Sequence, residues 1–212
     1  MVKPRPEKAT PDRDTEQRII VAAHAVFVRR GTAGARMQEI ADEAGVNKAL
    51  LHYYFRNKRR LAEAVFQQAI QRLFERVGGV VASAAPLDVK VPTLIALYLD
   101  QLSKSPFLPG YVLAELQQHP ERALQLTASL RGRRVRLLAT LDRQLKAEIR
   151  AGRMRRIPTR QFIVNLASLC IFPFAARPML CAILSLDADG FTRFIEERKK
   201  TLPPFFLAAL RP

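Results

Sequence analysis

Hydrophobic and polar positions along this chain repeat mainly with the three- and four-residue spacing of amphipathic helices. No alternating run of β-branched residues is long enough for a sheet, so the pattern predicts an all-α fold. The expected helices cover residues 14–31, 37–44, a brief segment after residue 47, about 58–77, 91–104, 110–118, about 121–150, about 158–176 and 190–210. Asp14 and Gln17 have capping-box spacing at the first start, Asn57 can cap the fourth helix, and Gly78-Gly79 is expected to end it. The last helix is expected to be kinked or split at Pro203-Pro204.

The second and third helices are separated by a short break around a glycine. Gly45 can take the left-handed conformation that ends a helix, and Asn47 is a good N-cap for the next one. In that next helix Leu51 and Phe55 lie on one side, and donors and rings occupy the others. Two short helices joined in this way predict a helix-turn-helix, whose second helix enters the major groove of DNA.

With its flanking pieces, the segment from residue 15 to about residue 68 resembles the DNA-binding domain of the TetR/AcrR family of bacterial transcriptional repressors. The matching residues are Ile40, Ala41, Ala44, Gly45, Val46, Lys48, Leu51, His52, Tyr53, Tyr54, Phe55, Asn57, Lys58 and Leu61. The resemblance implies an N-terminal three-helix DNA-binding domain over residues 14–60, with a fourth helix from about 58 leading onward. It also implies an all-helical effector-binding and dimerisation domain over residues 61–212, while the Pro-rich, basic residues 1–13 are expected to form a disordered arm.

The net charge of +16 and the pI near 10.8 favour a polyanionic partner, but the charge is not concentrated in the motif. Residues 1–77 carry +6 and the remainder carries +10. Residues 131–160 alone hold eleven Lys and Arg against Asp142 and Glu148. A solvated basic helix face is the expected reading of that segment, and attraction of an acidic effector or of nonspecific DNA remains open.

No pattern for an enzyme, a metal site or a cofactor is visible, so none of the three is expected. Cys170 and Cys181 lack a partnering motif, and the histidines lack evident catalytic partners. The N-terminus is charged rather than apolar, and the longest apolar run, residues 163–176, is too short to span a bilayer. We therefore expect a cytoplasmic, nucleoid-associated protein.

Side chains that read bases differ from those that bind phosphates, because only base edges carry sequence information. From exposure on the helices and from the family resemblance, Gln38, Lys48, Ala49 and His52 are expected at base edges. Asn47, Tyr53, Tyr54 and Lys58 are expected at phosphates, with Tyr54 partly in the core as an alternative. Arg36 stands where the family usually has a capping Thr or Ser; it cannot cap the helix, but its charge can reach a phosphate. Lys58, Arg59 and Arg60 in one first turn oppose the helix dipole, a conflict that a bound phosphate would relieve.

The resemblance further implies a homodimer on a palindromic operator and a small-molecule effector. The interface is expected on the last two long helices, where Phe162, Leu166, Leu169, Phe194 and Phe206 are interface or core positions. Candidate effector-binding residues are Tyr98, Phe107, Tyr111, Glu115, His119 and Asn165. The alternative is a DNA-binding structural or protein-interaction factor of the same fold without an effector. The sign of regulation, the operator and the effector itself are left open by the sequence.

Overall fold

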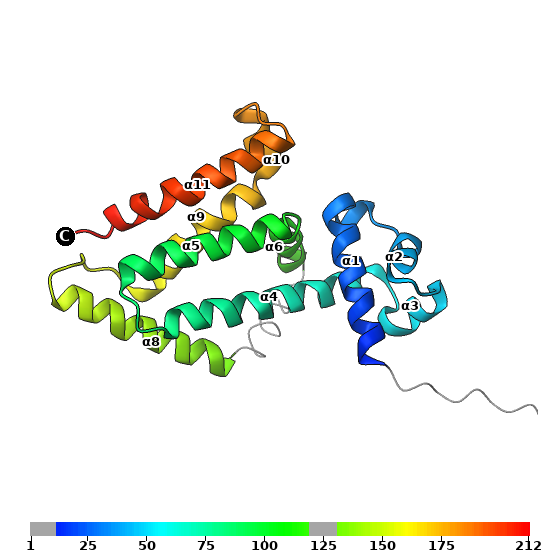
Figure 1. The fold of residues 1–212 in the computed structure, drawn as a ribbon, viewed down its shortest axis with the longest axis horizontal. Coiled ribbons are helices and arrows are strands. Elements are labelled where there is room, and N and C mark those ends of the chain that lie inside the picture. Colours follow the sequence, from blue (N-terminus) through cyan, green and yellow to red (C-terminus); the bar gives the residue numbers. More distant parts are fainter. Residues whose placement is uncertain (1–11, 119–130) are drawn as a thin grey trace, which may run out of the picture. The chain divides into compact units, whose positions relative to one another are not determined.

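The computed structural model describes residues 12–118 and 131–212, and all regular structure in these residues is helical, as predicted. The helices are α1 (Arg13–Gly34), α2 (Met37–Ala44), α3 (Lys48–Phe55), α4 (Lys58–Ala82), α5 (Leu87–Lys104), α6 (Leu108–Gln118), α8 (Arg131–Arg150), α9 (Thr159–Ala175), α10 (Arg177–Ile183) and α11 (Ala188–Ala208) (Figure 1). The chain divides after Gln68 into two compact units, which are described separately. Residues 1–11 of the expected arm lie outside the described residues.

The first unit consists of α1, α2, α3 and the start of α4 around a small apolar interior. Ile19 and Phe27 of α1, Ile40 of α2 and Leu51 of α3 are all fully buried. The N-cap of α1 is Asp12, whose carboxylate accepts from the Asp14 N–H at 3.1 Å, so the expected cap at Asp14 is wrong by two residues. The helical geometry of α1 is interrupted at Gly31, which has φ 68° and ψ 165°, a conformation that glycine adopts easily.

Two further boundaries differ from the sequence prediction. Gly78-Gly79 does not end α4, which continues to Ala82. Glycine costs about 1 kcal/mol in a helix, but Val81 beyond the pair is only 4% exposed and packs in the core of the second unit. Pro203-Pro204 does not split α11 either, because buried Leu202 and Phe206 hold the helix on both sides of the pair.

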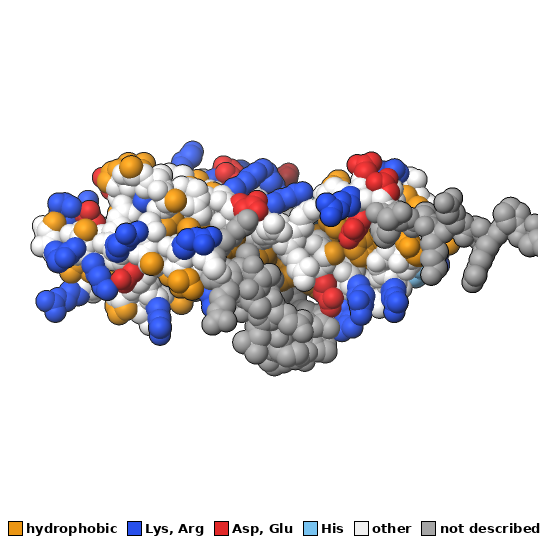
Figure 2. Space-filling view, turned by 90° about the horizontal axis from the view of Figure 1, so that it is seen from below, with side chains coloured by type: hydrophobic (Ala, Val, Ile, Leu, Met, Phe, Trp, Pro, Cys, Tyr) orange, Lys and Arg blue, Asp and Glu red, His pale blue; other side chains and the backbone are white. Residues whose placement is uncertain are grey.

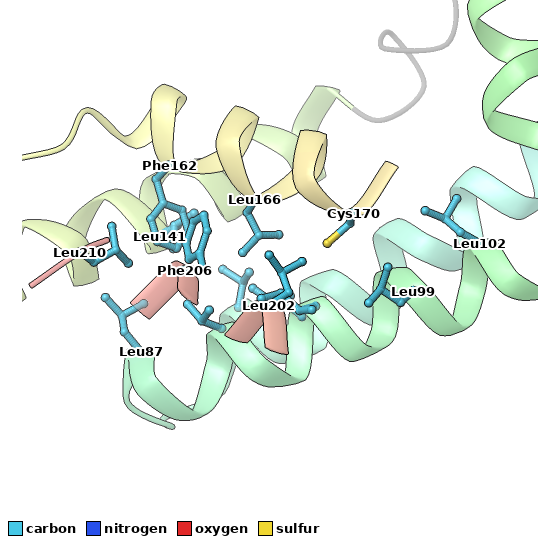
Figure 3. Close-up of a cluster of buried hydrophobic side chains, with 14 of the residues drawn as sticks. Leu87, Leu99, Leu102, Leu141, Phe162, Leu166, Cys170, Leu202, Phe206 and Leu210 are labelled. Carbon is cyan, nitrogen blue, oxygen red and sulfur yellow. The ribbon is translucent and has the colours of Figure 1, made fainter. Parts of the chain in front are cut away.

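The second unit is built around α5, α9 and α11, whose apolar faces form its core. Figure 3 shows Phe162, Leu166 and Cys170 of α9 directed toward Phe206 and Leu202 of α11. The Phe162 and Phe206 rings meet edge to face, with centroids 5.4 Å apart. These contacts pack α9 against α11 within a single chain.

A half-buried arginine completes the hydrogen bonding of α9. Pro173 lies inside α9 and has no N–H, so the carbonyl of Leu169 four residues earlier loses its helical donor. Arg198 of α11 supplies the missing donors, with Nε and Nη2 at 3.1 and 2.7 Å from that oxygen. Burial lowers the pKa of Arg198, and the guanidinium stays charged because its ordinary value is so high.

A buried lysine joins three helices of this unit. Lys90 of α5 is 3% exposed, and its Nζ donates to the Val81 carbonyl in the last turn of α4 at 2.8 Å. It also donates to Gln144 Oε1 of α8 at 2.7 Å, and Gln144 in turn donates to the Ala85 carbonyl. Burial lowers the pKa of Lys90.

Among the described residues, no single helix is both long and apolar enough to cross a membrane. The bent pair Thr159–Ala175 and Arg177–Ile183, with 73° between its helices, meets that length and composition only when the two are taken together.

Candidate nucleic-acid interface

Two local features and one bond from α1 fix the turn between α2 and α3. Gly45 ends α2 with φ 63°, the left-handed conformation expected from the sequence, and Asn47 Oδ1 caps α3 by accepting from the Leu50 N–H at 2.7 Å. Arg18 of α1 donates from Nη2 to the Ala44 carbonyl at 2.8 Å, which satisfies the C-terminus of α2. Arg18 was not identified from the sequence, because its partner is a backbone oxygen 26 residues away.

One face of α3 is free of the interior. Leu51 and Phe55 are buried, whereas Lys48, Ala49, His52 and Tyr53 are exposed, Tyr53 at 60%. Positions 52 and 53 follow positions 48 and 49 by four residues, about one helical turn, so the four positions lie on one side of the helix. We call these four residues the reading face. His52 Nδ1 lies 2.9 Å from the Arg56 carbonyl, which orients the ring on this face.

Two candidates at the start of α2 are also exposed. Arg36 is the N-cap residue but makes no capping side-chain bond, as expected for arginine. Gln38 donates from Nε2 to Asp42 Oδ1 at 2.8 Å along its own helix. A base contact by Gln38 would therefore compete with an existing hydrogen bond.

Tyr54 and Lys58, two of the expected phosphate residues, are engaged inside the first unit. The Tyr54 hydroxyl accepts from the Asp12 N–H at 3.0 Å, which ties α3 to the start of α1. Lys58 Nζ donates to the carbonyls of Ala33 and Ala35 at 2.8 and 3.0 Å, at the end of α1. These bonds give both side chains a structural role that the sequence pattern did not reveal.

The start of α4 presents backbone amides and cations together. Asn57 caps the helix as expected, its Oδ1 accepting from the Arg60 N–H at 3.0 Å. Arg59 and Arg60 are exposed in the first turn, and Arg59 approaches Glu63 only to 4.0 Å. Such a terminus suits a phosphate, because the helix dipole and the two cations act in the same direction.

The second unit contains a cavity of about 220 Å³ next to α4. Its lining residues come from α4, α5, α8 and α9: Phe74, Val77, Val81, Leu94, Tyr98, Arg134, Leu137, Leu138, Leu141, Phe162, Ile163 and Leu166. Tyr98 is the one effector candidate among them. Phe107 and Tyr111 are half-buried elsewhere, Asn165 is exposed, and Glu115 and His119 lie outside the described side chains.

Burial separates the expected interface residues into two groups. Phe162, Leu166 and Phe206 are at most 5% exposed and belong to the core of the chain itself. Leu169 and Phe194 are partly buried against that core. The large exposed apolar side chains on the same two helices are different ones, Val164, Phe172 and Phe205, at 56%, 52% and 64% exposure.

The basic residues of α8 and the following loop are spread over the surface rather than gathered at one point. Figure 2 shows Lys and Arg side chains scattered over the visible face of the second unit. Arg136, Arg143 and Arg150 are exposed, while Lys146 pairs with Asp142 at 2.8 Å. This arrangement agrees with the expected solvated basic face.

A capped second helix with an exposed polar and aromatic face, followed by a basic helix start, defines a helix-turn-helix DNA-binding protein. Residues 19–65 match the family model described as bacterial regulatory proteins, tetR family. The helix-turn-helix segment of the chain therefore belongs to this family of transcriptional regulators, as its sequence motif indicated.

Relatives with known roles resemble the chain mostly in its N-terminal part. The transcriptional activator FasR of Mycolicibacterium smegmatis is 44% identical over 28% of this chain and 27% of its own length. The transcriptional repressor SCO4008 of Streptomyces coelicolor is 46% identical over 42% of this chain and 40% of its own. The chain thus spans less than half of these two relatives. The nucleoid occlusion factor SlmA of Haemophilus influenzae is 23% identical over 79% of this chain and 76% of its own.

Solved structures extend the similarity of fold over most of the chain. FadR of Bacillus subtilis, solved in complex with stearoyl-CoA, has a TM-score of 0.63 at 19% identity. The match covers 92% of this chain and 99% of that one. At this identity the comparison shows a common fold and no more.

Proposed function

We propose that the protein is a homodimeric repressor that binds a palindromic operator and is released from it by a small-molecule effector. The observation that carries the proposal is the reading face on α3. Asn47 caps the N-terminus of this helix, and Asn57 caps the start of the next one. The lysine, histidine and tyrosine of the reading face are exposed, and Leu51 and Phe55 anchor the opposite side. A side chain held on a packed helix can discriminate between base edges in the major groove.

Within this proposal, Lys48, Ala49 and His52 are the strongest base-reading residues. Tyr53, Asn47, Arg36 and the amides and arginines at the start of α4 contact phosphates. Gln38 is a weaker candidate because its amide already bonds Asp42. Tyr54 and Lys58 contact DNA only with the donor capacity left over from their internal bonds.

Dimerisation follows from the small size of one reading face. A single helix-turn-helix contacts too few base pairs to select a site in a genome, and two copies on a pseudo-palindrome double the contacts. Exposed Val164, Phe172 and Phe205 on α9 and α11 are the residues that we place at the interface.

The effector is proposed from the cavity beside α4. Phe74, Val77 and Val81 of α4 line it, and the same helix begins at Lys58 in the first unit. A ligand that binds better when α4 is displaced shifts the population away from the DNA-binding conformer. The stearoyl-CoA complex of the similarly folded FadR is consistent with a ligand role for this unit.

The experiment that tests the proposal is a footprint on the DNA flanking the protein's own gene. The full chain is expected to protect a palindromic segment, with affinity that falls about a thousandfold or more between about 50 and about 200 mM salt. Equal affinity for the flanking DNA and for random DNA of the same length would contradict sequence-specific regulation.

A second candidate is a DNA-organising factor without an effector, favoured by the similarity to SlmA over 79% of this chain. Both candidates require the reading face, so DNA binding alone does not separate them. A screen for compounds that release the footprinted DNA separates the two candidates. Release by any compound that also raises the thermal stability of the protein favours the repressor.

A further inference from the structure

The cavity beside α4 combines apolar walls with one cation. Of the described residues that line it, Arg134 of α8 is the charged one. Leu137 and Leu141 come from the same helix, and Phe162 and Leu166 line the cavity from α9. An apolar cavity with a guanidinium at its wall is complementary to an apolar molecule that ends in an anionic group.

The guanidinium of Arg134 has no carboxylate partner among the described residues. Two other basic residues of the same region are paired, Lys146 with Asp142 at 2.8 Å and Arg153 with Glu148 at 2.7 Å. Arg134 is half-exposed, so its stem can follow the apolar wall while its head remains hydrated at the cavity mouth. An anion arriving there would gain a charge-assisted bond without first breaking an ion pair to any described residue.

A neutral donor lies in the same wall. Burial raises the pKa of Tyr98 to about 12, so its phenol stays protonated at neutral pH. In the described part of the chain, no group hydrogen-bonds the Tyr98 hydroxyl. The cavity therefore offers one charged and one neutral donor, and its other described lining groups are apolar.

A second hollow in this unit is less suited to an anion. It measures about 480 Å³ and is lined in part by Asp88, Glu148, Arg153 and Arg211. Arg153 is already held by both Glu148 oxygens, at 2.7 and 2.9 Å. The two carboxylates offset the two arginines among its described lining residues, so the hollow offers an anionic ligand no net positive charge, and the cavity with Arg134 is the better site.

We propose that the cavity beside α4 binds a medium-chain aliphatic carboxylate, with Arg134 pairing the carboxylate and Tyr98 donating from the wall. This inference rests on the proposed function, because it names the class of the effector. The cavity volume of about 220 Å³ is about seven times the volume that one water molecule occupies in the liquid. A methylene group occupies roughly the same volume as one such water molecule. A chain of about eight carbons therefore fills the cavity.

The test is calorimetric titration of the full chain with octanoate, butanoate and octan-1-ol. Octanoate is expected to bind about ten- to a hundredfold more tightly than octan-1-ol, because the alcohol lacks the charge that Arg134 pairs. Affinity is expected to fall about fourfold for each methylene removed, so butanoate binds weakly. Equal binding of octanoate and octan-1-ol would overturn the inference without any variant.

Two variants locate the site. Arg134→Gln is expected to reduce octanoate affinity at least tenfold and to leave octan-1-ol unchanged, and Arg134→Lys is expected to restore part of the loss. Arg136→Gln is the matched control, because Arg136 is exposed on the same helix and does not line the cavity. Wild-type octanoate affinity in Arg134→Gln would overturn the assignment, and thermal unfolding shows that each variant is folded.

The outcome for the ligand class is separate from the outcome for the proposed function. Operator release by another compound, with no octanoate binding, overturns the ligand class and supports the repressor. Octanoate binding through Arg134 without any effect on DNA affinity supports the ligand class and contradicts its role as effector.

Discussion

At the scale of single residues, partners inside the protein determine which donors remain for DNA. Lys48 is exposed on the reading face, whereas Lys58 has two carbonyl partners and Tyr54 has Asp12. The sequence marks all three as matching positions of one motif. Only the coordinates separate them, because a bond from Lys58 to Ala33 joins residues that are 25 positions apart.

We predict that Lys48→Ala lowers affinity for the operator about ten- to a hundredfold. The ratio of operator affinity to random-DNA affinity is expected to fall as well. The reason is that a base-edge contact contributes about 1–3 kcal/mol of discrimination. Arg60→Ala provides the contrast: loss of a phosphate contact is expected to weaken operator and random DNA alike and to reduce the salt slope. Competition gel shifts measure both, and an unchanged preference in Lys48→Ala would remove Lys48 from the reading face.

At the scale of elements, the sequence predicts caps and turns well where the signal is local. The Gly45 turn, the Asn47 cap and the Asn57 cap each depend on residues within about three positions, and the structure confirms all three. Distant packing decides the remaining boundaries. The α4 helix continues through Gly78-Gly79 because Val81 is buried by other elements, and no local pattern contains that information.

The α10 helix, Arg177–Ile183, was not predicted because it is too short. Its seven residues are too few to show a period. The cavity could not be predicted either, since its lining comes from α4, α5, α8 and α9, and its closure depends on how those helices pack.

The link between Arg198 and α9 makes a prediction that belongs to this scale. Arg198→Met is expected to lower the free energy of unfolding by about 1–3 kcal/mol, because the Leu169 carbonyl loses both donors. Pro173→Ala restores the backbone N–H that α9 lacks, so in that background Arg198→Met is expected to cost clearly less. Urea unfolding of the two single variants and the double variant measures the coupling, and purely additive effects would contradict the exchange of donors.

At the scale of the whole molecule, charge and apolar surface have different distributions. The region from Ala69 onward holds 22 of the 35 Lys and Arg residues and 11 of the 19 Asp and Glu residues, so net charge does not identify the DNA-binding unit. The identification comes from the reading face and its caps. The exposed apolar side chains on α9 and α11, in contrast, are distinct from those that form the core.

We predict that Phe172→Glu together with Phe205→Glu converts the proposed dimer to a monomer. Both side chains are more than half exposed, so the chain is expected to fold normally, while two buried carboxylates in an interface would oppose association. Sedimentation is expected to give twice the 23.9 kDa chain mass for the wild type and a single chain mass for the variant. Val135→Glu, at a 58% exposed position on α8, is the control and should remain dimeric. A variant that still sediments as a dimer would place the interface elsewhere.

Lys90 sets a limit on how the wall of the cavity can move. The residue is 3% exposed, and among the described residues its ammonium has only the Val81 carbonyl and the Gln144 amide oxygen as partners. Pulling the last turn of α4 away from α5 would leave a dehydrated cation short of an oxygen, a penalty of several times the thermal energy. A molecule that enters the cavity is therefore expected to leave the last turn of α4 in place. The rest of the helix can respond only by tilting about that fixed turn.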